Sequence, residues 1–328
     1  MAERLALTLW HSVPDETLME AARSGELETD EGILAQVERM LADPDKGDRF
    51  LAGFINRNFS LPSAEAVPPG LENLPDAELL SEDLRMESTL YLAKIFESDV
   101  GASALVTNTT THLNGRLSEF YGFGNVSGDE FVEVSTEGTG RTGGLLTMGG
   151  TLARQGDLVH RGVAILNTLF CQPFEAPDAD LVDAALRTLP ENPTIREEIA
   201  LRAENSACVG CHALIDPLGA PFEIFDEAGL PQTEYANGES VHHGLSFQNT
   251  PLDTPDDVTS TITQTEYLAC LSKHVLETVG SRRLDLQGNE AVRCATEELL
   301  ADLEPEPGLR SIVARAFLSN MFQARVVE

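Results

Sequence analysis

One pentapeptide holds two cysteines and a histidine at a spacing that suits a covalently bound metal cofactor. It reads Cys208-Val209-Gly210-Cys211-His212, the C-x-x-C-H pattern of c-type haem attachment. Residues three apart lie on the same face of a helix, so the thiols of Cys208 and Cys211 can reach the two vinyl groups of one porphyrin. The next residue, His212, can then direct its imidazole to the iron. The pattern predicts one covalent haem with His212 as an iron ligand.

The segment after the motif, ALIDPLGAPFEIFDEAG, predicts the surroundings of that haem. Three residues in it favour an irregular turn: Pro217, Gly219 and Pro221. A backbone carbonyl of this turn is expected to accept a hydrogen bond from the outer nitrogen of His212 and so fix its tautomer. We expect three apolar side chains to form a wall of the haem pocket: Phe222, Ile224 and Phe225. The same side chains would also suit the core of any small domain.

Three other chemistries share the motif. A zinc site would need two more ligands, for which His242 and His243 are the candidates, although adjacent residues on an extended segment point to opposite faces. A thioredoxin-like redox pair follows a strand, whereas a helix with a capping box at Thr194 and Glu197 precedes this motif. A structural disulfide would leave His212 without a role. Haem attachment is therefore the favoured interpretation.

A second axial ligand is predicted at Met148, because a thioether can bind haem iron. Met148 stands among glycines in LLTMGGTLA, where the backbone can approach a ring closely. The alternatives are an open or water-bound iron and five other side chains: His160, His242, His243, His274 and Met321.

Three cysteines lie outside the motif: Cys171, Cys270 and Cys294. An oxidising compartment favours one disulfide and one free thiol among them. Cys270 and Cys294 fall on consecutive predicted helices, so we expect these two to pair. Three buried, reduced cysteines are the alternative.

The composition restricts the possible partners. The 328 residues include 54 Asp and Glu against 22 Lys and Arg, a formal net charge of -32. Such a chain repels phosphate backbones, so we expect no nucleic-acid partner. A basic redox partner protein, or a salty medium that screens the repulsion, suits the charge better.

The expected location follows from the cofactor, because haem c is normally attached outside the cytoplasm. No apolar run approaches the roughly 20 residues that a membrane span requires, and the start MAERLALTLWHSVPDE lacks the pattern of a signal peptide. We therefore expect a periplasmic or extracellular protein whose export signal lies upstream, with Met1 an artificial start or the chain a mature fragment.

The apolar spacing predicts a mainly α fold. A short strand is expected at 131–134 and a small hairpin in the polar segment through Gly244. A wrapped loop is expected at 217–231. The predicted helices cover residues 14–25, 33–41, 50–59, 79–96, 111–121, 159–170, 267–279, 291–303 and 309–322, and one more runs from Thr194 into the motif. We expect three consecutive modules: an N-terminal helical domain (1–125), a central cytochrome-c-like haem module with long loops (126–250), and a C-terminal helical module (251–328).

The chain resembles the planctomycete-type multidomain haem c proteins, which carry cytochrome-associated domains of unknown function. The resemblance covers nearly the whole chain, in the stretches RLALTLWHSVPDETLMEAARSGEL, THLNGRLSEFYG, GGLLTMGGTLA, HRGVAILNTLFCQP, TIREEIALRAENSACVGCHALIDPLGAPFEIFDEAG, YLACLSKHVLETVGSRRLD and LRSIVARAFLSNMFQARVV. It implies haem attachment at Cys208 and Cys211, iron ligation by His212, and an extracytoplasmic site. Members carry Met, His or other residues at the position of Met148. Longer members have further domains upstream, often with another haem motif, and this chain begins inside that arrangement.

These features predict a c-type cytochrome that transfers electrons. Two alternatives stay open. One is a haem enzyme of the peroxidase or oxidase kind with an open distal site, and the other is a haem-bearing subunit of a larger complex.

Overall fold

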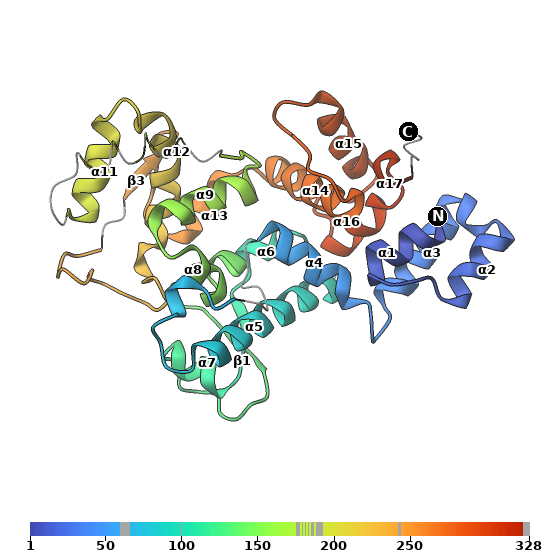
Figure 1. The fold of residues 1–328 in the computed structure, drawn as a ribbon, viewed down its shortest axis with the longest axis horizontal. Helices are drawn as coiled ribbons and strands as arrows, with labels where there is room; N and C mark the ends of the chain where they lie inside the picture. The colour runs from blue at the N-terminus through green and yellow to red at the C-terminus, as the bar shows by residue number, and fades with distance from the viewer. Residues whose placement is uncertain are drawn as a thin grey trace. The chain divides into compact units, whose positions relative to one another are not determined.

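The computed structural model describes residues 1–59, 66–98, 100–174, 193–241 and 244–323, together with positions 178, 180, 182, 184 and 187. Over these residues the chain is mainly helical, with two small antiparallel sheets (Figure 1). The prediction of a mainly α fold is confirmed. Within the described residues, no helix is both long enough and apolar enough to cross a bilayer.

The chain forms two compact units that interleave along the sequence. The first contains Met1–Asn58, Thr89–Leu105 and Gln264–Glu328, and the second contains Phe59–Ser88 and Val106–Thr263. The predicted modules, in contrast, are consecutive, and they stay a prediction.

The first unit is built from helices at both ends of the chain. They are α1 (Ala2–Trp10), α2 (Glu16–Ser24), η1 (Glu26–Glu28), α3 (Asp30–Leu41), α4 (Asp48–Asn58), the second half of α5 (Ala77–Ser98), α14 (Gln264–Gly280), α15 (Glu290–Ala301), α16 (Leu309–Ala316) and α17 (Asn320–Gln323). One continuous helix over 309–322 was expected, and that prediction is wrong, because α16 ends at Ala316 and a turn precedes α17.

An aromatic row forms part of the core of the first unit. The Phe50 ring stacks near Phe54 and packs against Phe317, whose ring in turn meets Phe322 edge-on at 4.8 Å between centroids. All four side chains are buried. These contacts connect α4 to the C-terminal helices, which explains why segments so distant in sequence share one unit.

The second unit carries the cysteine motif. Its elements are η2 (Pro69–Leu71), the first half of α5, α6 (Ala104–Thr107) at the boundary, β1 (Thr110–Leu113), α7 (Gly115–Phe120), β2 (Val132–Ser135), η3 (Gly144–Thr147), α8 (Gly149–Gln155), α9 (Leu158–Leu169), α11 (Ile195–Glu204), α12 (Val209–Gly219), η4 (Ala220–Ile224), β3 (Leu245–Phe247), β4 (Thr250–Leu252) and α13 (Pro255–Thr261). Strands β1 and β2 pair antiparallel, as do β3 and β4.

The predicted helix over 111–121 is wrong in its first turn. Residues 110–113 form β1, in which Thr111 and Leu113 are buried and Thr110 and His112 are not. The helix α7 begins only after Asn114, whose Oδ1 accepts a hydrogen bond from the Leu117 amide at 2.9 Å. The β-branched threonines and the capping asparagine favour this arrangement over a longer helix.

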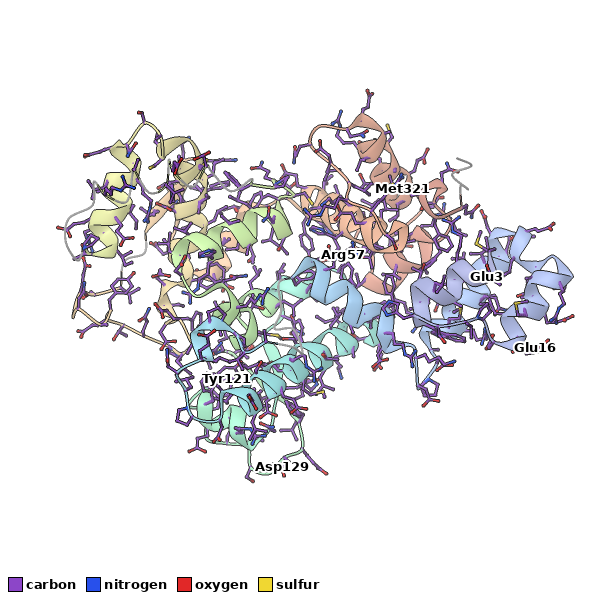
Figure 2. All side chains as sticks on the ribbon, in the orientation of Figure 1. Glu3, Glu16, Arg57, Tyr121, Asp129 and Met321 are labelled. Carbon is purple, nitrogen blue, oxygen red and sulfur yellow. The ribbon has the colours of Figure 1, made fainter. Side chains whose placement is uncertain are left out.

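A hydrophobic cluster stabilises the second unit around α5, α7 and α8. Its buried members are Leu71, Leu80, Leu84, Leu113, Leu117, Tyr121, Ala153 and Ala228. Tyr121 is labelled in Figure 2, close to the end of α7. Ala228 belongs to the chain that follows the cysteine motif, so this cluster helps to fix that segment.

Helices α9 and α12 pack at very close range. A Cβ atom on Gly162 of α9 would overlap the carbonyl oxygen of Ile215, and one on Gly219 of α12 would overlap that of Leu158. Close backbone approach of this kind is a standard use of glycine. The crossing fixes the C-terminal half of α12, and thereby the position of the motif at its N-terminal end.

Candidate haem-attachment site

The cysteine motif forms the first turn of α12. Cys208 is the residue that precedes the helix, and its carbonyl accepts hydrogen bonds from the amides of Cys211 at 3.2 Å and His212 at 3.0 Å. The spacing therefore produces the helical turn that the sequence predicts. This turn is the geometry that brings residues three apart onto one face.

Both motif thiols are free. Cys208 is half-buried and Cys211 is exposed, whereas Cys171 and Cys270 are disulfide-bonded. The predicted disulfide between Cys270 and Cys294 is therefore wrong, and Cys294 is an exposed free thiol. Position on consecutive helices did not decide the pairing, because a disulfide also requires suitable Cα and Cβ distances.

The imidazole of His212 is held by a carboxylate one helical turn away. Nδ1 of His212 lies 2.8 Å from Oδ1 of Asp216, and the His212 side chain is 21% exposed. We expected a backbone carbonyl as the acceptor, and that prediction is wrong. Its premise also fails, because Pro217 does not start a loop but lies buried inside α12.

Asp216 is itself held by an arginine. Its carboxylate is almost completely buried, and Oδ2 accepts a hydrogen bond from Nε of Arg202 at 3.0 Å. Arg202 also donates to Glu198 at 3.0 Å within α11. The predicted capping box at the start of α11 is confirmed: Thr194 and Glu197 bond each other's backbone amides. The cap fixes the start of the helix that supplies Arg202.

Apolar residues around the motif are only partly buried. The structure describes every residue of α11, and none of these residues is buried. On α12, Val209 is 38% exposed, and a Cβ on Gly210 would meet no described atom within 4 Å. Side chains become fully buried only from Ile215 onward. Two free thiols, an oriented imidazole and partly exposed apolar side chains together fit the attachment of a flat apolar ring.

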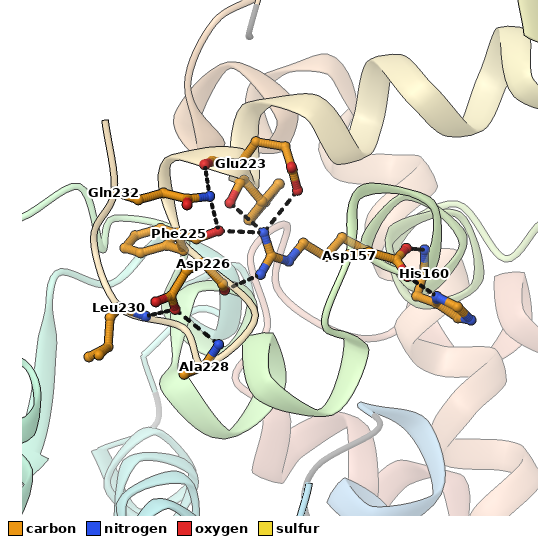
Figure 3. A network of polar contacts seen from close by, with 10 residues as sticks. Asp157, His160, Glu223, Phe225, Asp226, Ala228, Leu230 and Gln232 are labelled. Atoms are coloured by element: carbon orange, nitrogen blue, oxygen red, sulfur yellow. Dashed lines mark hydrogen bonds and ion pairs between the residues drawn. The ribbon is translucent and has the colours of Figure 1, made fainter. Parts of the chain in front are cut away.

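The segment after α12 is fixed by a buried arginine (Figure 3). Nη1 of Arg161 donates to the carbonyls of Phe222 and Phe225, each at 2.8 Å, and Nη2 donates to the carbonyl of Asp226 at 2.6 Å. The Asp226 carboxylate accepts from the amides of Ala228 and Leu230. Phe222 and Phe225 are buried, and their contact with a haem stays a prediction.

A second buried arginine joins this segment to the glycine-rich stretch around Met148. Arg141 donates to the carbonyls of Thr147 and Gly229, and its guanidinium lies 4.8 Å from the centre of the Phe225 ring and 4.0 Å from that of Tyr121. Arg141 therefore connects the backbone of the glycine-rich stretch to that of the segment after α12.

The structure places Met148 at the N-terminus of α8, with its side chain buried. The helix α8 packs mainly on η2, η3 and α9, whereas α12 packs mainly on α9, α11, β3 and η4. Both helices thus pack against α9, and the role of Met148 as a ligand stays a prediction.

The other candidate ligands are spread over the chain. His160 is exposed on α9 and bonds Asp157 at 2.8 Å. His274 lies on α14 and Met321, labelled in Figure 2, lies on α17; both belong to the first unit. His242 and His243, the candidate zinc ligands, lie outside the described residues.

Sequence reasoning missed the two residues that position His212. The spacing of His212 and Asp216, four residues apart on one helix, is a signal that could have found the carboxylate. Arg202 carries no such signal, because its distance to Asp216 depends on the packing of α11 against α12.

Two family models match the chain. The model described as PSD4, Protein of unknown function (DUF1592), covers residues 1–123. The model described as PSCyt3, Protein of unknown function (DUF1588), covers residues 141–235 and so includes the cysteine motif. No curated protein and no solved structure matches the chain. Both models describe cytochrome-c-associated domains. The chain therefore belongs to the planctomycete-type family of cytochrome-c-associated domains of unknown function.

Proposed function

We propose that this chain is a c-type cytochrome that transfers electrons outside the cytoplasm. The observation that carries the proposal is the first turn of α12, where the free thiols of Cys208 and Cys211 precede an imidazole already oriented by Asp216. The cytochrome-c-associated family adds support. When bound, haem c would supply a one-electron iron couple.

The chain's own residues have separate tasks. The thiols of Cys208 and Cys211 would hold the haem by adding across one vinyl group each; the thiol hydrogen would move to the neighbouring vinyl carbon, so the addition would need no oxidant. A carboxylate only accepts hydrogen bonds, so Asp216 keeps the hydrogen of His212 on Nδ1 and leaves the Nε2 lone pair for the iron. Met148 is the second residue proposed to bind the iron.

The net charge of -32 suggests the nature of the redox partner. Carboxylates on both units would attract a basic protein and accelerate the encounter. The experiment is to mix the reduced protein rapidly with a small basic redox protein and with an acidic one of similar potential. We expect fast electron transfer to the basic protein, slowed by added salt because salt screens the attraction.

Rates that are equal for both partners and independent of salt would contradict the proposed partner. A fast reaction with peroxide in place of transfer to either protein would instead support the haem enzyme. The spectrum of Met148→Ala tests the second ligand, because loss of a ligating sulfur converts a low-spin spectrum to a high-spin one. An unchanged spectrum would exclude Met148.

A further inference from the structure

The pair of side chains behind His212 forms a connected and largely buried unit. Asp216 bonds His212 through Oδ1 and Arg202 through Oδ2, at 2.8 and 3.0 Å. The exposed fractions of the Asp216 and Arg202 side chains are 4% and 15%. The Asp216 carboxylate therefore lies between the imidazole of His212 on α12 and the guanidinium of Arg202 on α11, and it is the most buried of the three groups.

A buried carboxylate is a stronger acceptor than a neutral carbonyl, because the bond is charge-assisted and the surroundings screen it weakly. Hydrogen bonding of this kind to the outer nitrogen of a ligating histidine makes the imidazole a better electron donor. A better donor stabilises ferric over ferrous iron and lowers the reduction potential. Arg202 withdraws part of this negative charge, because it competes for the same carboxylate.

We infer that Asp216 is a positioning residue that orients His212 and lowers the reduction potential of the haem site, and that Arg202 limits this lowering. The inference rests on the proposed function, since it requires a haem on His212. It assigns opposite effects to two neighbouring residues, which a merely structural role would not produce.

The test measures the reduction potential of the full chain, matured with haem, by titration at an electrode. Asp216→Asn keeps the size of the side chain and an acceptor but removes the charge. We expect it to raise the potential by at least about 59 mV, which is a tenfold change in the equilibrium constant of a one-electron couple. Arg202→Gln is expected to lower the potential, because the carboxylate then keeps its full charge.

Glu198→Gln is the matched control. Glu198 bonds Arg202 at 3.0 Å, whereas the hydrogen bonds of Asp216 are to His212 and Arg202, so Glu198 is one hydrogen bond farther from the imidazole. Removal of the Glu198 charge is expected to shift the potential less than either other variant does. Equal potentials for the wild type and Asp216→Asn, or shifts of the same sign for Asp216→Asn and Arg202→Gln, would overturn the inference.

The proposed function and the inference fail in different ways. A wild-type chain that takes up no haem would contradict the proposed function, whereas a haem-loaded Asp216→Asn variant with an unchanged potential would contradict only the inference. If Asp216→Asn does not mature, nitrogen NMR of the haem-free wild type decides. The inference requires the neutral His212 ring to carry its hydrogen on Nδ1, and a hydrogen on Nε2 would overturn it.

Discussion

Arg161 and Glu223 form an ion pair in the interior of the second unit: Nη1 lies 3.1 Å from Oε1, and the two side chains are 1% and 7% exposed. The same guanidinium nitrogen bonds the carbonyls of Phe222 and Phe225. A buried guanidinium with this many acceptors fixes the backbone after α12 (Figure 3). The segment that follows the cysteine motif is thus held from the side of α9.

The first prediction concerns the pH dependence of stability. Burial raises the pKa of Glu223 to about 6, although Arg161 opposes the shift. The unfolded value is 4.5, so between these values the folded protein binds more protons than the unfolded chain does. The contribution of Glu223 to the free energy of unfolding must therefore fall as the pH rises from 4.5 to about 6, by at most about 2 kcal/mol.

Chemical denaturation of the wild type and Glu223→Gln at several pH values checks this. The stability advantage of the wild type over the variant is expected to shrink across that window. Glu227→Gln removes the same charge from an exposed position nearby and reports the effect of net charge alone. An advantage that grows with pH would show that the folded protein favours the ionised form of Glu223.

The second prediction concerns the crossing of α9 and α12. Gly162→Ala would place a methyl group on the carbonyl oxygen of Ile215, so we expect a loss of about 2 kcal/mol or more, the range of overpacked cores. Gly210→Ala meets no described atom within 4 Å and is expected to be neutral, or to stabilise by up to about 1 kcal/mol, because alanine is the better helix former.

Both glycine variants are compared in the same haem state by thermal or denaturant unfolding. Equal stabilities for Gly162→Ala and Gly210→Ala would contradict the close approach of the two helices. A less stable Gly162→Ala together with a Gly210→Ala of normal stability would confirm that the close approach of the helices, and not helix propensity, determines the loss of stability.

The third prediction concerns a buried polar network beside Met148. The Tyr121 hydroxyl donates to Oε2 of Glu87 at 2.6 Å and accepts from the Gly149 amide at 2.9 Å. Burial raises the pKa of Glu87 above its usual range. Tyr121→Phe would leave the buried Gly149 amide without this acceptor, and we expect a loss of about 1–3 kcal/mol.

A double-mutant cycle with Glu87→Gln isolates the pair. Because Glu87 also accepts from Thr111 at 2.6 Å, its own variant is expected to cost stability independently. The two losses should not add. If the losses of stability of the two single variants add fully, or if Tyr121→Phe is as stable as the wild type, the hydroxyl does not connect Glu87 to the Gly149 amide.

Local sequence signals predicted the parts of this fold that short-range interactions decide. The capping box of Thr194 and Glu197 and the turn from Cys208 to His212 both depend on neighbouring residues alone, and both are present. One exception, at 110–113, arises because pairing with β2 competes with helix formation, and pairing is not visible in a single segment.

Long-range packing decided what the sequence did not predict. The acceptor of His212 was expected after Pro217, yet the close fit of Gly219 against Leu158 keeps Pro217 inside a helix and leaves Asp216 as the partner. The predicted pairing of Cys270 with Cys294 is wrong for the same reason, since only the folded backbone brings cysteines to bonding distance.

The intact mass of the protein after extracytoplasmic maturation tests the central proposal most directly. We predict a mass gain of one haem with no loss of hydrogen, which survives denaturation in the wild type and disappears when Cys208 and Cys211 are both replaced by Ser. Replacement of Cys294 by Ser should leave the gain intact. A matured wild-type chain without added haem mass, or an equal gain in the double variant, would contradict the proposed attachment site.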